Sequence, residues 1–122
     1  MTDKFAERRG ARRFDATLSL QVSLPDGVST LETINISSSG LYFRSTRFME
    51  PMTKLAMELE VAVPDADGPA RVPCEGLVVR VTPDMPQAGC EEYEVAVFFT
   101  YIEPEGREIF ERHLAMLLEA GT

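Results

Sequence analysis

The feature that most limits the fold of this 122-residue chain is a repeated alternation of apolar and polar residues. Apolar side chains recur at every second position in several short segments, which are separated by Pro, Gly, Asp or Ser. A period of two is typical of strands with one buried face. From Pro104 onwards the apolar spacing changes to three and four, which predicts one amphipathic helix over about residues 104–119.

The six predicted strands are short and follow one another at similar intervals. They cover about residues 17–24, 29–36, 41–43, 55–63, 71–81 and 92–101. In the fifth strand the alternation slips at Glu75–Gly76, which predicts a β-bulge. Short strands followed by one helix indicate a mainly β fold, either a barrel or a sandwich, with the helix over an open end or against one face. The length suits a single domain.

The net charge of −8 is divided unevenly along the chain. Residues 1–15 carry five basic and three acidic side chains, so this segment holds +2 and the rest of the chain holds −10. An acidic body argues against binding to long nucleic acids or to anionic membranes. The apolar runs are also far shorter than the ~18 residues that a membrane span needs, so we expect no membrane insertion.

The N-terminal sequence MTDKFAERRGARR lacks the apolar segment of a secretory signal. We therefore expect a cytoplasmic location with Cys74 and Cys90 as reduced thiols, and a Cys74–Cys90 disulfide is the alternative for an exported chain. With His113 as the only histidine and no closely spaced cysteines, no metal site is expected. No nucleophile–base set, phosphate-binding loop or dinucleotide motif is present, so we expect no enzymatic activity and no cofactor.

Four arginines fall within six residues near the N-terminus: Arg8, Arg9, Arg12 and Arg13. Guanidinium groups stay charged, and their paired donors fit phosphate oxygens or the O6/N7 edge of guanine. A spacing of four relates Arg9 to Arg13 and also Arg8 to Arg12, so either register could present two guanidiniums to one ligand. We interpret residues 1–15 as a flexible basic arm, and a solubilising tail is the simpler alternative.

A second feature is the run Asn35-Ile36-Ser37-Ser38-Ser39-Gly40 at the end of a predicted strand. Asn35 and Ser37 are two residues apart, so they point the same way in an extended chain. The Asn amide both donates and accepts hydrogen bonds, as a base edge requires, and Ser adds a hydroxyl. Gly40 permits a positive φ or a close approach of the backbone to a ligand. An ordinary polar turn between strands is the simpler alternative.

Together, the RxxxR run of Arg9–Arg13, preceded by Glu7-Arg8, and the (D/N)xSxxG run of Asn35–Gly40 resemble the PilZ domain family. The resemblance extends to Gly76-Leu77-Val78 and to Ala96-Val97-Phe98-Phe99, so it covers nearly the whole chain. Ala96 stands where the family usually has glycine, and Phe14 stands where an aliphatic residue commonly follows the second arginine. The resemblance implies a stand-alone domain that folds as a six-stranded antiparallel β-barrel with a C-terminal α-helix.

The resemblance also implies a bacterial cytoplasmic receptor for the second messenger cyclic di-GMP, involved in the regulation of motility or biofilm formation. The arginines would bind guanine edges and phosphates, the Asn and Ser would read a guanine edge, and the Gly would keep the barrel surface clear. The implied ligand-binding residues are Arg8, Arg9, Arg13, Asn35, Ser37 and Gly40. The arm of residues 1–15 would close over the nucleotide on the barrel of residues 16–122, and an unidentified downstream protein would recognise the changed surface.

Two alternatives remain open for the function. A PilZ-fold adaptor could act through protein contacts with weak or no nucleotide binding. A small barrel that binds single-stranded nucleic acid would need a cationic groove with aromatic platforms, whereas this chain has no Trp and its strand surfaces are acidic. The expected partners are therefore cyclic di-GMP and a protein, and no nucleic acid polymer.

Overall fold

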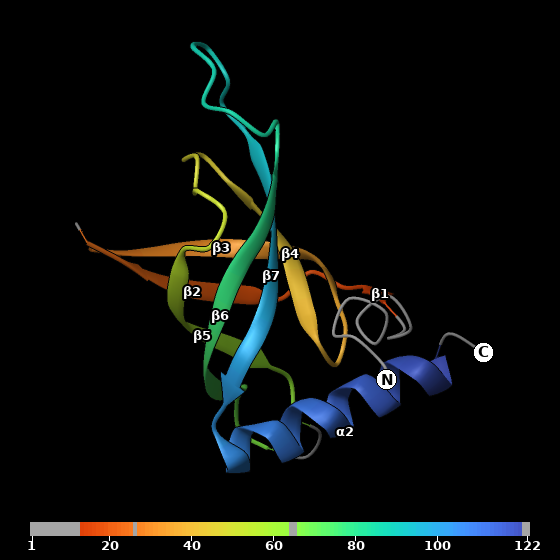
Figure 1. Ribbon diagram of the computed structural model, residues 1–122. Coiled ribbons are helices and arrows are strands. Elements are labelled where there is room, and N and C mark those ends of the chain that lie inside the picture. Colours follow the sequence, from red (N-terminus) through yellow and green to blue (C-terminus); the bar gives the residue numbers. More distant parts are fainter. Residues whose placement is uncertain (1–12, 26, 64–65, 121–122) are drawn as a thin grey trace, which may run out of the picture.

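The computed structural model describes residues 13–25, 27–63 and 66–120, and in this part of the chain seven strands precede one helix (Figure 1). The elements are β1 (Phe14–Asp15), β2 (Ser19–Leu24), β3 (Gly27–Ile36), β4 (Gly40–Ser45), β5 (Lys54–Val61), β6 (Ala70–Thr82), β7 (Tyr93–Ile102) and α2 (Pro104–Ala120). The predicted helix of about 104–119 is confirmed. The predicted arm of residues 1–15 includes Phe14 and Asp15, which belong to β1, whereas residues 1–12 lie outside the described residues.

The strands form one antiparallel sheet that closes on itself. Their order is β1-β3-β2-β5-β6-β7-β4, and β3 also pairs with β4, so the six strands from β2 to β7 make a closed barrel. Strand β1 is an extra short strand beside the end of β3. The prediction of a mainly β, six-stranded antiparallel barrel with a C-terminal α-helix is confirmed, and closure decides between barrel and sandwich. We call the β3–β4 pairing, with β1 beside it, the closing seam.

The core fills the barrel with the alternate side chains that the period of two predicts. On β5 the inward set of Leu55, Met57, Leu59 and Val61 is buried. Helix α2 lies across one end of the barrel (Figure 1) and contacts β6, β5 and β1. The Phe110 ring of α2 packs edge-on against Phe99 of β7, with centroids 5.6 Å apart. Within the described part of the chain, no helix has the length and apolar character needed to cross a membrane.

A β-bulge in β3 determines which way Asn35 faces. Thr33 pairs with Phe43 and Asn35 pairs with Tyr42, so two steps along β3 correspond to one step along β4 and Ile34 is the extra residue. Thr33 and Phe43 are buried. Strict alternation from Thr33 would turn Asn35 inward as well, but the bulge reverses the phase. Asn35 therefore lies on the outer face opposite Tyr42.

A second β-bulge, in β6, turns the Arg80 side chain to the outer face of the sheet. Val78 pairs with Val97 and Arg80 pairs with Ala96 of β7, so Val79 is the extra residue. Val78 is buried although it lies two residues before the exposed Arg80. Both bulges thus turn a polar side chain outwards at a position where simple alternation would bury it.

The bulge predicted at Glu75–Gly76 is present, but its extra residue lies on the neighbouring strand. Between Glu75 and Gly76 the pairing with β7 skips Thr100. As a result, strict alternation from Phe99, which would place Tyr101 on the buried face, does not hold at the end of β7: Tyr101 is exposed and Ile102 takes the inward position.

Candidate functional site

The two sequence motifs meet at the closing seam. Arg13 immediately precedes β1, and Asp15 of β1 pairs with Asn35 of β3. The Nη1 atom of Arg13 donates a hydrogen bond of 3.0 Å to Oδ1 of Asn35. The last arginine of the RxxxR run therefore contacts the first residue of the NxSxxG run, 22 positions later in the chain. Arg8 and Arg9 lie outside the described residues.

Thr33 fixes the chain that follows β1. Its side chain is buried, and its Oγ1 accepts a hydrogen bond of 2.8 Å from the Leu18 amide. The same hydroxyl donates to the Ala16 carbonyl at 2.6 Å. These two bonds hold the connection between β1 and β2 against β3, and they therefore limit where Arg13 can lie.

Tyr42 of β4 and Arg80 of β6 extend the site, and sequence analysis missed both. The Cζ atom of Arg13 lies 4.9 Å from the centroid of the Tyr42 ring, and the Cζ atom of Arg80 lies 5.6 Å from it. Arg80 also donates a hydrogen bond to the Tyr42 hydroxyl. A cation over an aromatic face contributes about 0.5–1 kcal/mol at an exposed site. Neither guanidinium forms a salt bridge with a carboxylate of the described residues.

Arg80, Tyr42 and Asn35 belong to one row across the outer face of the sheet, and the Arg13 side chain lies over this row. The row runs through paired residues from β6 to β1: Arg80, Ala96, Tyr42, Asn35 and Asp15. Arg80 and Tyr42 are two strand spacings apart, about 10 Å, so their side chains meet above Ala96. The small, buried Ala96 leaves room for that contact. The two bulges are what place Arg80 and Asn35 on this face.

Ser37 does not share the orientation of Asn35. β3 ends one residue before Ser37, and the Ser37 side chain is only 1% exposed. Its Oγ accepts hydrogen bonds from the amides of Ser39 and Gly40, both at 3.2 Å. The expectation that Asn35 and Ser37 point the same way is therefore wrong, because the chain turns before Ser37 and the hydroxyl caps that turn.

Gly40 has a structural reason to be glycine. Its φ is not positive, so no unusual backbone conformation is involved. A Cβ atom at this position would instead lie 2.2 Å from the carbonyl oxygen of Val97 on β7. Ser37 thus stabilises the turn between β3 and β4, and Gly40 permits the close contact between β4 and β7. Both residues help to hold Asn35, before the turn, and Tyr42, after it, in place.

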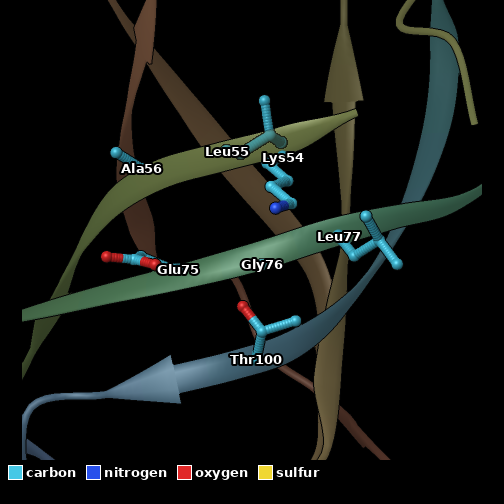
Figure 2. A pocket seen from close by; sticks show the side chains of 7 residues that line it. All are labelled: Lys54, Leu55, Ala56, Glu75, Gly76, Leu77 and Thr100. Atoms are coloured by element: carbon cyan, nitrogen blue, oxygen red, sulfur yellow. The ribbon is translucent and has the colours of Figure 1, made fainter. Parts of the chain in front are cut away.

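A separate hollow of about 570 Å³ lies away from the seam, between β5, β6 and β7. Figure 2 shows Lys54 and Glu75 extending from the neighbouring strands β5 and β6, with Thr100 on β7. Its single ammonium group is accompanied by a carboxylate, so the hollow has no excess of positive charge. At the seam, the guanidiniums of Arg13 and of the nearby Arg80 outnumber the one carboxylate of Asp15, so this site suits an anion better.

Burial shifts the pKa values of two titratable groups, Cys74 and His113. Burial raises the pKa of the Cys74 thiol to about 12, and the carboxylate of Glu75 adds to this rise. Burial lowers the pKa of His113. Both cysteines are free thiols. No group of three or more potential metal ligands occurs within the described ranges of the chain.

The fold places the chain in a class of six-stranded antiparallel barrels that carry a C-terminal helix. A family model described as "PilZ domain" matches residues 7–116, and the chain therefore belongs to the PilZ domain family. The resemblance inferred from the arginine run and the NxSxxG run is confirmed. PilZ domains are receptor and adaptor domains, typically for cyclic di-GMP.

Two solved structures share the fold. The inhibitor of motility MotI/DgrA of Bacillus subtilis has a TM-score of 0.69 and 17% identity, and the match covers 92% of this chain and 52% of that one. This chain thus spans about half the length of the Bacillus protein. The PilZ domain of Escherichia coli YcgR with c-di-GMP has a TM-score of 0.58 and 15% identity, covering 93% and 94% of the two chains. No curated protein sequence matches this chain.

Proposed function

We propose that this chain is a cyclic di-GMP receptor whose N-terminal arginines bind the nucleotide across the closing seam. The observation that carries the proposal is the hydrogen bond between Arg13 and Asn35, because it joins the two motifs at one place. Membership of the PilZ domain family supports the proposal. So does the fold shared with the YcgR domain, which is described with c-di-GMP.

The chemistry of the seam is complementary to that nucleotide. Cyclic di-GMP has two phosphates and two guanines, and guanidinium forks fit both phosphate oxygens and the O6/N7 edge of guanine. Arg13 and Arg80 supply fixed positive charge, and the amide of Asn35 can both donate and accept. The Tyr42 ring supplies an aromatic face on which a guanine can stack.

Arg13 and Asn35 form one hydrogen bond with each other, and Arg13 covers the Tyr42 ring. A bound nucleotide would take over these contacts, with Arg8 and Arg9 closing over its phosphates. A hydrogen bond to a charged group contributes roughly 1.5–3 kcal/mol. Several of them would offset the roughly 1–2 kcal/mol per residue that ordering the arm costs. In this proposal, Ser37 and Gly40 act by holding the turn beside Asn35.

The output is a change in the surface around the arm, which a downstream protein would recognise. This step is an order–disorder transition of a segment next to a fixed barrel. It requires no catalytic group.

The test is isothermal titration calorimetry with cyclic di-GMP on the wild type and on Arg9→Ala, Arg13→Ala and Asn35→Ala. Loss of one charged hydrogen bond predicts a roughly tenfold to hundredfold weaker affinity for each arginine variant, and loss of one neutral hydrogen bond predicts a roughly twofold to tenfold weaker affinity for Asn35→Ala. Arg71→Ala is the matched control, because Arg71 is an exposed arginine that pairs with Glu58 at 3.2 Å, outside the seam.

Cyclic di-AMP serves as the ligand control, since adenine lacks the O6 acceptor of guanine and should bind more weakly. A folded wild type that does not bind micromolar cyclic di-GMP would refute the proposal and favour an adaptor that acts through protein contacts alone. Undiminished binding by both Arg13→Ala and Asn35→Ala would refute the assignment of the site to the seam.

A further inference from the structure

Four side chains on the outer face of the barrel take their arrangement from the register between β5 and β6. Lys54 pairs with Leu77, and two residues further along β5 Ala56 pairs with Glu75. The residues between these two pairs are buried, so the four side chains themselves point outwards. They lie at the corners of a rectangle of about 5 Å by 7 Å, from the spacing of strands and of residues along a strand. We call Lys54, Ala56, Glu75 and Leu77 the β5–β6 face.

The surface at this face is hollowed. All four residues line the hollow of about 570 Å³ that Figure 2 shows, together with Thr100 of β7. The outside of a closed barrel is generally convex, so a hollow here is a local concavity that can receive a side chain of another molecule. Tyr101, which pairs with Glu75 across the next strand boundary, is 49% exposed. Tyrosine is enriched in protein interfaces.

The two charges of the β5–β6 face have no ion-pair partner within the described part of the chain. Arg71 and Glu58, further along the same two strands, form a salt bridge of 3.2 Å. Lys54 and Glu75 form none, either with each other or with another described residue. They occupy one diagonal of the rectangle, and Ala56 and Leu77 occupy the other. One positive and one negative side chain therefore remain available to a partner.

This arrangement is complementary to itself. A two-fold axis through the centre of the rectangle, normal to the sheet, exchanges the two ends of each diagonal. It would place Lys54 of one copy opposite Glu75 of a second copy, and the reverse. The same axis would place the large Leu77 side chain opposite the small Ala56. An isologous dimer requires such a match of a surface with itself.

We propose that this chain forms a two-fold symmetric dimer through the β5–β6 face, with Leu77 of each copy entering the hollow of the other. The proposal does not depend on nucleotide binding, because Arg13 and Asn35 meet at the closing seam, outside this face. The face is small and its charges are exposed. The dimer should therefore be weak, with a dissociation constant on the order of 0.1 mM, and it should weaken further at high salt.

The experiment is sedimentation equilibrium of the full chain without nucleotide, at low ionic strength and at concentrations on both sides of that constant. Lys54→Glu and Glu75→Lys should each weaken dimerisation at least about tenfold, because each turns both ion pairs of the dimer into like-charge contacts. An equimolar mixture of the two variants should regain the wild-type affinity to within about threefold. In that heterodimer, opposite charges again meet at both positions.

Arg107→Glu and Glu111→Lys are the matched controls. Both residues are exposed on α2, and the two changes alter the net charge by the same amounts as the test variants. Each control alone and their mixture should dimerise as the wild type does. A further variant, Ala56→Gln, keeps the charge and fills the space opposite Leu77, so it should weaken dimerisation at least about tenfold. Circular dichroism checks that every variant is folded.

A wild type that remains monomeric at ten times the expected dissociation constant would overturn the proposal. Folded single variants that dimerise as tightly as the wild type would also overturn it. The mixture is the most specific check: if it associates no more tightly than its two components, Lys54 and Glu75 do not face each other across a two-fold axis.

Discussion

Replacing Gly40 by alanine should destabilise the barrel by about 2–4 kcal/mol. The new Cβ would lie 2.2 Å from the Val97 carbonyl oxygen, and ordinary contact begins at 3.4 Å, so β4 and β7 must separate by about 1.2 Å. The obstacle is backbone, which cannot rotate away as a side chain can. The neighbouring bond from the Phe99 amide to the Ser39 carbonyl, now 2.9 Å, would stretch beyond hydrogen-bonding distance. One lost bond contributes about 1 kcal/mol and overpacking about 1–3 kcal/mol.

The assay is urea denaturation followed by circular dichroism, with thermal melts in parallel. A loss of this size should lower the melting temperature by roughly 10 °C in a domain of this length. Gly68→Ala is the control, because a Cβ there meets nothing within 4 Å and should change stability by less than about 0.5 kcal/mol. If Gly40→Ala and Gly68→Ala were equally stable, the close approach of the β4 and β7 backbones would not explain why residue 40 is glycine.

Three further predictions concern buried groups. Thr33→Val should lower the free energy of unfolding by about 2 kcal/mol in urea denaturation, because it removes both hydrogen bonds of the hydroxyl and leaves a partly buried amide and carbonyl without this partner. An unchanged free energy of unfolding would contradict this. Because burial lowers the pKa of His113 in the folded chain below its ordinary 6.5, the unfolded chain binds the proton more readily. The free energy of unfolding should therefore have its full value above pH 6.5 and should fall as the pH decreases from 6.5 towards the folded-state pKa. In His113→Leu this fall should be smaller. In mildly alkaline buffer, an aromatic disulfide reagent should modify Cys90 in the native protein but not Cys74, because the pKa of the buried Cys74 thiol is raised to about 12. Cys74 should react only after urea has unfolded the chain. Rapid reaction of both thiols in the native protein would contradict the burial of Cys74.

Much of the fold could be predicted because its signals are local. The alternation on β5 gave the inward set directly, and Pro104 marked the start of α2 because proline suits the first turn of a helix. The slip at Glu75–Gly76 located a bulge, but pairing between strands decides which strand carries the extra residue. That information is absent from a single segment of sequence.

Only the site residues that belong to a sequence motif could be predicted. Arg13 and Asn35 were identified and do meet. Tyr42 and Arg80 were missed because their contact depends on the register of three strands and on the phase change at Val79. Buried residues three apart, such as Val78 and Val81, were the available signal of that phase change.

Strand β3 takes its register from different neighbours along its length. Residues 27–32 take their register from β2, and the following residues take theirs from β4 and β1. The β2–β3 hairpin turn lies at the opposite end of β3 from Asn35, so the pairings that place Asn35 do not include the turn. The hairpin turn is accordingly a suitable place to insert a fluorescent label or a reporter domain, since an added segment there would leave the row from Arg80 to Asp15 in its present register.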